Sequence, residues 1–193
     1  TYSLLLQGYR SLPKPRAVEK TYLELAGYPY LENVASNLLE FFLYPEAGHG
    51  LGTVMLEALL EAAGYEWEAA DLQNVSVERE STTDSRQRMD LVVSSETLVI
   101  GVENKLFAEL QNDFRHYQGH LRKQAVDRRV VALLLSLYPV QPAPFLAGFT
   151  PLTYADLFCC LLPRLGRPLL AANPRYTPLL FDFITTIEHL KDG

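Results

Sequence analysis

The spacing of apolar residues divides the first half of the chain into helices and strands. Apolar side chains recur every three or four positions over residues 32–43 and 53–63, which predicts two amphipathic helices. Alternation at Val75 and Val77, followed by the Val-, Leu- and Ile-rich runs 88–93 and 98–105, predicts three strands. Polar turns at 81–87 and 94–97 separate these strands.

The second half of the chain is also predicted to contain both helices and strands. Residues 110–124 are polar with apolar side chains three and four apart, which predicts a helix with one face on a sheet. The uninterrupted apolar run 129–137 is typical of a strand buried on both faces. A short strand at 152–154 and helices over 154–165 and 176–190 follow. This order predicts an α/β fold, a mixed central sheet with helices on both faces.

Length and composition predict one domain over residues 1–193. The chain has 193 residues, 48% of them hydrophobic, which is enough for one core and short of two. Three prolines within residues 1–31 predict an irregular N-terminal arm with one short helix over 17–26. We expect no membrane span and see no leader segment, although the first residue is not Met.

The charge balance argues against broad, nonspecific binding of nucleic acid. Asp and Glu number 23 against 17 Lys and Arg, for a net charge of −6. Basic residues nevertheless gather in the middle of the chain, where they could act on phosphate locally. They are Arg79, Arg86, Arg88, Arg115, Arg122, Lys123, Arg128 and Arg129.

The cysteines and histidines favour a reducing compartment and argue against zinc. Cys159 and Cys160 are adjacent in an apolar run, so they predict buried thiols in a reducing cytoplasm rather than a disulfide. The four histidines are scattered without the regular spacing of a Cys/His metal site.

Charged residues interrupt the two apolar strands at 88–93 and 98–105. If these strands pair as an antiparallel hairpin about the 96–97 bond, residues whose numbers sum to 193 face each other, which places Asp90 opposite Glu103. Alternation puts Glu103 and Lys105 on one face and Val102 on the other. The hairpin therefore predicts a cluster of Asp90, Glu103 and Lys105 on an apolar support.

Two desolvated carboxylates are costly unless a cation neutralises them, and a hard divalent ion such as Mg²⁺ takes oxygen ligands. A shared ion would hold the carboxylates of Asp90 and Glu103 roughly 3–5 Å apart. The alternative is an edge hairpin whose Asp90, Glu103 and Lys105 face water as ordinary charge pairs, and spacing alone slightly favours that arrangement.

The same residues resemble a known family. Asp90, followed at the end of the next strand by Glu103-Asn104-Lys105, resembles the D…(D/E)xK signature of the PD-(D/E)XK nuclease superfamily. That resemblance implies a three-layer α/β/α sandwich with a restriction-endonuclease-like core. It also implies a metal-dependent nuclease that hydrolyses phosphodiester bonds of DNA, with Mg²⁺ as cofactor and Mn²⁺ as a substitute.

Further segments resemble a bacterial branch of that superfamily. Residues 32–39, the proline after Tyr44 and the His-Gly-Leu-Gly run at 49–52 resemble its N-terminal helix and loop, and residues 111–117 resemble its helix after the ExK strand. The chain departs from that branch at Tyr44, where Asp usually precedes the proline, and at Glu40-Phe41, where Ala-Trp is usual. These departures do not touch Asp90, Glu103 or Lys105.

The resemblance also implies roles for individual residues. Asp90, Glu103, the backbone carbonyl of Asn104 and Glu32 would bind the metal. Lys105 would orient the attacking water or neutralise charge on the phosphate, and a metal nearby would favour a pKa for it closer to neutral. With Lys105, the carboxylates Asp90, Glu103 and Glu32 are the expected catalytic residues.

Four further residues are the expected substrate contacts: His49, Arg88, Gln111 and Tyr117. Glycines around His49 would let it approach a phosphate, and the alternative is a loop histidine that caps a helix. We expect Tyr117 to lie half in the core and half in the site.

Two other functional classes stay open. A catalytically inactive nuclease-like module that binds protein or nucleic acid would agree with the net negative charge, although the intact Asp90, Glu103 and Lys105 oppose it. An unrelated α/β enzyme could use the same carboxylates for hydrolysis without a phosphate substrate. The sequence contains no P-loop, GxGxxG or GxSxG motif, which disfavours nucleotide-dependent and serine-hydrolase versions. A homodimer or an accessory protein partner also stays open.

Overall fold

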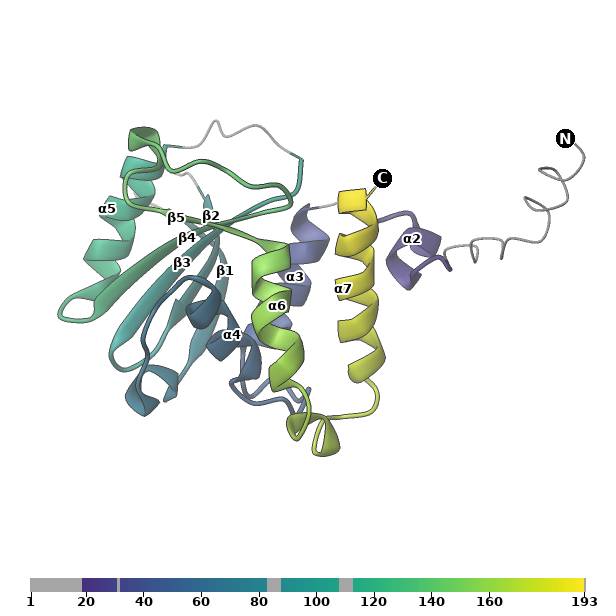
Figure 1. Cartoon of the computed structure of the whole chain (residues 1–193). Helices are drawn as coiled ribbons and strands as arrows, with labels where there is room; N and C mark the ends of the chain where they lie inside the picture. Colours follow the sequence, from purple (N-terminus) through teal and green to yellow (C-terminus); the bar gives the residue numbers. More distant parts are fainter. Residues whose placement is uncertain (1–18, 31, 83–87, 108–112, 193) are drawn as a thin grey trace, which may run out of the picture.

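The computed structural model describes residues 19–30, 32–82, 88–107 and 113–192. Figure 1 shows its elements, which in chain order are α2 (Tyr22–Ala26), α3 (Glu32–Leu43), α4 (Val54–Ala62), η1 (Ala69–Leu72), β1 (Ser76–Thr82), β2 (Arg88–Ser94), β3 (Leu98–Lys105), α5 (Phe114–Ala125), β4 (Arg129–Ser136), η2 (Pro144–Leu146), β5 (Thr150–Thr153), α6 (Tyr154–Arg164), η3 (Pro168–Leu170) and α7 (Thr177–Asp192). None of the helices in these ranges is long and apolar enough to cross a lipid bilayer.

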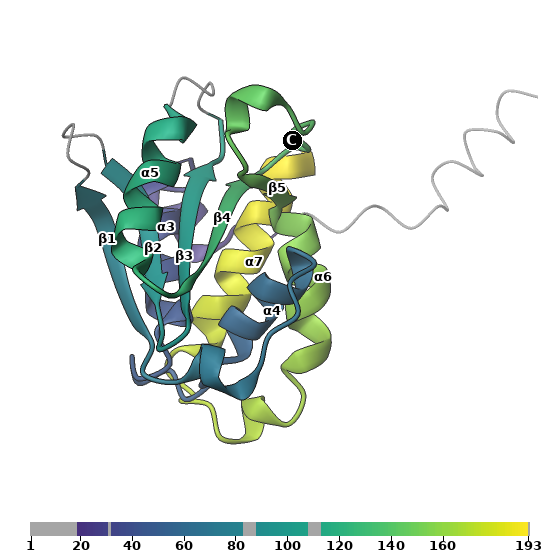
Figure 2. The ribbon, with the colours of Figure 1, turned by 90° about the vertical axis from the view of Figure 1, so that its left-hand side faces the viewer.

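The strands form one mixed sheet in the order β1-β2-β3-β4-β5. β1, β2 and β3 pair antiparallel, whereas β3, β4 and β5 pair parallel. Figure 2 shows the strands side by side with α5 crossing the face toward the viewer. The prediction of a mixed central sheet is confirmed, and β3 is its middle strand.

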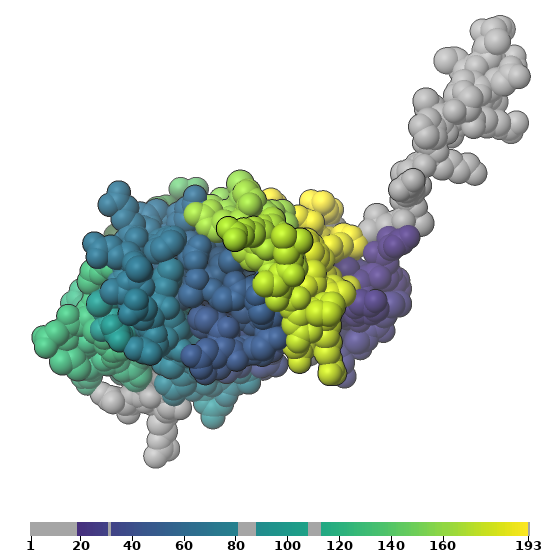
Figure 3. Space-filling model, turned by 90° about the horizontal axis from the view of Figure 1, so that it is seen from below, coloured from purple at the N-terminus to yellow at the C-terminus, as the bar shows by residue number. Residues whose placement is uncertain are grey.

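Helices cover both faces of the sheet, so the predicted α/β/α layering is confirmed. Alternation along β3 sends Ile100 and Val102 into a core shared with α3, α4, α6 and α7. Val99 points the other way, into a smaller core with Phe114 and Leu121 of α5. Figure 1 shows α5 on the side of the sheet away from α3, α6 and α7. Seen from below in Figure 3, α2 lies against the C-terminal helix α7 at the edge of the molecule.

Capping residues explain where several predicted elements end. Thr153 caps α6 in a reciprocal pair with Asp156, so β5 ends there and not at 154. In α2, Thr21 and Glu24 form the same motif, which starts the helix at Tyr22, and Gly27 ends it with φ of 80°. The described part of the expected 17–26 helix is therefore shorter than predicted.

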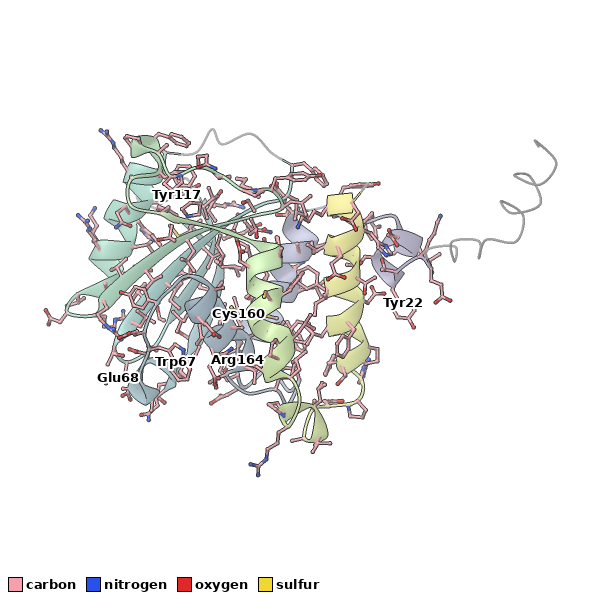
Figure 4. The ribbon with its side chains drawn as sticks, viewed as in Figure 1. Tyr22, Trp67, Glu68, Tyr117, Cys160 and Arg164 are labelled. Atoms are coloured by element: carbon pink, nitrogen blue, oxygen red, sulfur yellow. The ribbon has the colours of Figure 1, made fainter. Side chains whose placement is uncertain are left out.

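The prediction of buried thiols is wrong for Cys159. Cys159 is exposed and Cys160 partly buried, and both are free. The cause is the orientation of α6, which directs Leu157, Phe158 and Leu161 into the core and leaves the intervening positions outside. Figure 4 labels Cys160 on this helix.

Candidate active site

The β2–β3 hairpin has the predicted register. Its backbone pairs run from Leu91 opposite Val102 to Ser94 opposite Val99, so the paired numbers sum to 193. The backbone pairing ends at Leu91, so Asp90, the preceding residue of β2, has no backbone partner in β3. At that point Asp90 Oδ2 accepts the backbone N–H of Asn104 at 2.7 Å. The Asp90 side chain thus takes the place of a strand carbonyl where the two strands separate.

Strand β2 is irregular around Asp90. Met89 and Val92 are three residues apart, yet both pack in the core on the α5 side, which simple alternation forbids. The β1–β2 pairs pass from Arg79–Leu91 to Ser81–Met89 without a pair at Asp90. The residue opposite, Glu80, has φ of 53°, a strained left-handed conformation. This irregularity turns Asp90 toward the edge of β3.

Glu103 and Lys105 form a largely buried ion pair at the end of β3. Lys105 Nζ lies 3.1 Å from Glu103 Oε1, and the two side chains are 14% and 1% exposed. On its other side, Lys105 Nζ lies 3.7 Å from Glu32 Oε2. Glu32 begins α3, and its Oε1 accepts the backbone N–H groups of Leu106 at 2.9 Å and Phe107 at 3.3 Å. Lys105 therefore lies between two carboxylates.

Asn104 fixes the end of β3 against two helices. Its fully buried Nδ2 donates to Ser36 Oγ at 3.0 Å and to the carbonyl of Glu32 at 3.3 Å, both in α3. Its Oδ1 accepts from the hydroxyl of Tyr154 at 2.8 Å, in α6. The N–H and C=O of one strand residue face the same neighbour. Because the Asn104 N–H is bound by Asp90, the Asn104 carbonyl also faces Asp90.

Sequence reasoning did not identify Tyr154. In the sequence it begins an amphipathic helix and is indistinguishable from an ordinary core aromatic residue. Only the fold shows that its buried hydroxyl meets Asn104. Burial raises the pKa of Tyr154 well above its usual value, so the hydroxyl keeps its proton and donates.

Burial and mutual repulsion dominate the electrostatics of the cluster. Burial, and then the charge of Asp90, raise the pKa of Glu103 to about 7. Burial also raises the pKa of Asp90, against the hydrogen bond from Asn104. Burial alone would lower the pKa of Lys105, but the charges of Glu103, Glu32 and Asp90 outweigh it and the pKa is raised. In the metal-free protein Lys105 is therefore protonated, whereas a bound metal would favour a pKa closer to neutral.

The donor set agrees with a hard divalent cation. Asp90, Glu103 and the Asn104 carbonyl supply oxygen atoms on the same edge of β3, and the two buried carboxylates repel each other until a cation neutralises them. Across the described residues, no group of three or more His, Cys, Asp or Glu side chains is arranged to hold a metal. The structure does not bring Glu32 into such a group, since Lys105 lies between Glu32 and Glu103.

Tyr117 is a core residue on the α5 side of the sheet, as Figure 4 shows. It is 3% exposed and packs against Phe114 and Phe149. Its hydroxyl donates to the carbonyl of Arg88 at 2.7 Å, two residues before Asp90. The structure therefore does not present Tyr117 to a substrate, because its ring fills the core and its hydroxyl anchors the start of β2.

His49 lies away from the cluster and inside the protein. It is 1% exposed, its Nε2 is 2.9 Å from the Tyr44 carbonyl, and its Nδ1 accepts the N–H of Leu51 at 3.0 Å. It packs on Phe41 and Phe42, roughly 14–15 Å along α3 from Glu32. One loop glycine, Gly50, has a packing reason, since a Cβ there would lie 2.9 Å from the Ala171 carbonyl. The structure does not bring His49 to a phosphate near Asp90.

Arg88 and Gln111 are the other two predicted substrate contacts. Arg88 lies two residues before Asp90. Its side chain is 64% exposed, and its Nη1 lies 2.8 Å from Glu80 Oε2. Gln111 lies outside the described residues.

The fold and the cluster together define a class of protein: an α/β/α sandwich with a carboxylate–lysine centre where two strands of the central sheet separate. A family model described as the PD-(D/E)XK nuclease superfamily matches residues 21–147, so the chain belongs to this superfamily. Its fold is accordingly restriction-endonuclease-like. The matched range contains Glu32, Asp90, Glu103 and Lys105 and ends before Tyr154. Neither a curated protein nor a solved structure matches the chain.

Proposed function

We propose that the protein is a metal-dependent nuclease that hydrolyses phosphodiester bonds of DNA, with Mg²⁺ as its cofactor and Mn²⁺ as a substitute. One observation carries the proposal. Asp90 binds the Asn104 amide beside the buried Glu103–Lys105 pair, so two carboxylates, a carbonyl and a cation converge on one edge of β3. A surface charge pair would be solvated, whereas Glu103 is 1% exposed.

Asp90, Glu103 and the Asn104 carbonyl would hold the metal. When bound, the metal polarises the scissile phosphate and lowers the pKa of a coordinated water. Lys105, held between Glu103 and Glu32, would orient the attacking water or neutralise negative charge that develops on the phosphate. Its tether between Glu103 and Glu32 keeps the ammonium in one place, which reduces the reorganisation needed in the transition state.

Glu32, Ser36 and Tyr154 are positioning residues in this proposal. Glu32 links the start of α3 to Lys105 and to the backbone after β3. Ser36 and Tyr154 hold the amide of Asn104 from opposite sides. Together they fix the strand end that carries Glu103 and Lys105. We also propose a location in the reducing cytoplasm, where thiols such as those of Cys159 and Cys160 stay reduced.

Cleavage assays with matched variants test the proposal. The purified chain, with Mg²⁺, Mn²⁺ or EDTA, is incubated with supercoiled, linear duplex and single-stranded DNA. Asp90→Asn, Glu103→Gln and Lys105→Ala should each lower the rate by about a hundredfold or more, which corresponds to about 2.7 kcal/mol of barrier. Glu66→Gln and Lys191→Ala, which alter exposed charges elsewhere, should leave the rate unchanged.

Two results would reject the proposal. One is a folded wild-type protein that cuts no DNA with either metal and instead binds a protein through the same edge of the sheet. The other is cutting at the wild-type rate, without metal, by the double variant Asp90→Asn/Glu103→Gln, which would reveal a contaminant or another site.

A further inference from the structure

A pocket of 220 Å³ opens beside Lys105, at the ends of β3 and β4. Phe107 and Tyr138 line it together with Val140 and the Lys105 side chain. Phe107 is 51% exposed and Tyr138 49% exposed, so both rings present apolar surface to solvent. Exposed aromatic rings of this size are costly to hydrate, and a ligand that stacks on them would recover that cost.

The pocket is attached to the candidate catalytic cluster. Lys105 belongs to both, and Phe107 follows it by two residues, within roughly 7 Å of chain. The N–H of Phe107 donates to Glu32 Oε1 at 3.3 Å, the carboxylate that also pairs with Lys105. Lys105 is paired in register with Ser136 of β4, so the two chain segments that follow leave the sheet at the same edge.

Backbone contacts hold the second ring. The Ser136 hydroxyl donates to the carbonyl of Tyr138 at 2.8 Å, and the Tyr138 hydroxyl lies 3.5 Å from the carbonyl of Leu190. A third ring extends the aromatic surface, because Tyr30 is 66% exposed and its centroid lies 5.8 Å from that of Phe107. The rings thus occupy defined positions beside Lys105.

We infer that this pocket binds an unpaired nucleobase next to the scissile phosphate, so that single-stranded or frayed DNA is the preferred substrate. The inference rests on the proposed nuclease function. A base within a duplex must first be unpaired and unstacked before it can enter, whereas a single strand offers its π-faces freely. At 220 Å³ the pocket is smaller than the roughly 300–1,000 Å³ of sites for drug-sized ligands, which suits one ring system.

The charge of the protein favours the same substrate. A protein with a net charge of −6 is expected to neutralise few DNA phosphates, so counterion release can contribute little affinity. Stacking contributes affinity that does not depend on net charge and tolerates any base. Aromatic stacking next to Lys105 therefore supplies binding affinity for a single strand that an acidic protein does not gain from phosphate contacts.

Binding measured in EDTA tests the inference without any cleavage. Fluorescence anisotropy follows a labelled single-stranded oligonucleotide and the matching duplex. Phe107→Ala and Tyr138→Ala should each weaken single-strand binding about tenfold and duplex binding little. Phe107→Trp should retain affinity, whereas Phe107→Leu, apolar but not aromatic, should lose it. Tyr22→Ala is the control, since Tyr22 is 67% exposed on α2 and outside this pocket.

Removing the base from the DNA sharpens the test. A series of single strands is prepared, each with one abasic residue at a different position. At one position Phe107→Ala should no longer weaken binding, because the base that stacks on Phe107 is already missing. The inference fails if no position shows coupling, or if single-strand and duplex binding fall equally. It also fails if Phe107→Ala and Tyr138→Ala change only the oligomeric state in light scattering, which would identify a protein interface.

The same variants separate this inference from the proposed function. A protein that binds single strands through Phe107 but cuts no DNA with Mg²⁺ or Mn²⁺ would reject the nuclease proposal and keep the pocket. A protein that cuts duplex and single strands equally, with Phe107→Ala and Tyr138→Ala as active as wild type, would keep the nuclease and reject the pocket.

Discussion

At the scale of single residues, Asn104 links the two halves of the candidate site. Its backbone N–H binds Asp90, while its side chain binds Ser36 of α3 and Tyr154 of α6. The pairing of Asp90 with the end of β3 could be predicted from the sequence, because strand alternation and hairpin register need only residue numbers. The role of Tyr154 could not, since it depends on how α6 packs.

His49 and Tyr117 show the limit of inference from residue type. Both are polar aromatic residues in segments that resemble site segments of the family, and both are buried with their polar atoms bonded to backbone. Burial follows from tertiary packing, which a local motif does not contain. Glu32 and Ser36 were predictable as neighbours because residues four apart on a helix share a face.

The first residue-scale prediction concerns Tyr154. Tyr154→Phe leaves the buried Oδ1 of Asn104 without its donor, so we expect the free energy of unfolding to fall by about 1–3 kcal/mol. Urea unfolding followed by circular dichroism measures the change. Tyr22→Phe, at an exposed position, is the matched control and should change it by less than about 0.5 kcal/mol. A Tyr154→Phe protein as stable as wild type would show that the hydrogen bond contributes little.

A second prediction at this scale uses the repulsion within the metal-free cluster. In EDTA, Glu103→Gln and Asp90→Asn remove one of two neighbouring buried charges, so their melting temperatures should equal that of wild type or exceed it by about 2–4 °C. With Mg²⁺ the order should reverse, because only the wild type gains binding energy in the folded state. Variants that melt far below wild type in EDTA would identify Asp90 and Glu103 as structural.

At the scale of elements, local signals predicted most of the architecture. Helices α3, α4, α6 and α7 and the strands β2, β3 and β4 follow from apolar spacing alone. The short 3-10 turns η1, η2 and η3 were not predicted, since three or four residues carry no periodicity. The irregularity of β2 at Asp90 could not be predicted either, because it is defined by how β2 pairs with both β1 and β3.

The loop after α3 gives an element-scale prediction. Burial, against the hydrogen bond to Tyr44, lowers the pKa of His49 below its usual 6.5. The folded protein then binds fewer protons than the unfolded chain, so stability contributed by His49 is complete above pH 6.5 and is lost as pH falls toward the lowered pKa. As pH falls across this range, the unfolding free energy of wild type should decline relative to that of His49→Gln. Glu103, whose pKa is raised to about 7, acts in the opposite direction but equally in both proteins.

A control separates His49 from general acid destabilisation. His116 is only partly buried on α5, and His116→Gln should follow the same dependence of stability on pH as wild type. If His49→Gln and wild type lose stability in parallel, the neutral form of His49 does not hold the loop, and its contacts with Tyr44 and Leu51 are incidental.

At the scale of the whole molecule, the cluster lies at one edge of the sheet, where the start of α3 meets the ends of β3 and β4. Helices on both faces shield the cluster from the sides, which accounts for the burial of Glu103. The layer order was predictable because it follows from element order. Which edge carries exposed aromatic rings was not, since Phe107 and Tyr138 read as ordinary apolar residues in the sequence.

The last prediction joins net charge to the mode of DNA binding. A protein that makes 6–10 phosphate contacts loses about 10³–10⁵ in affinity between about 50 and 200 mM salt. With a net charge of −6 and Arg88 as an exposed cation near Asp90, this protein should lose about tenfold or less. Arg88→Ala should flatten the dependence further, by about 0.7 in the slope for a single strand. Phe107→Ala should lower affinity equally at every salt concentration, because stacking releases no counterions. Anisotropy titrations across this salt range measure both slopes, and a slope of about −6 or steeper for wild type would instead indicate a basic binding surface.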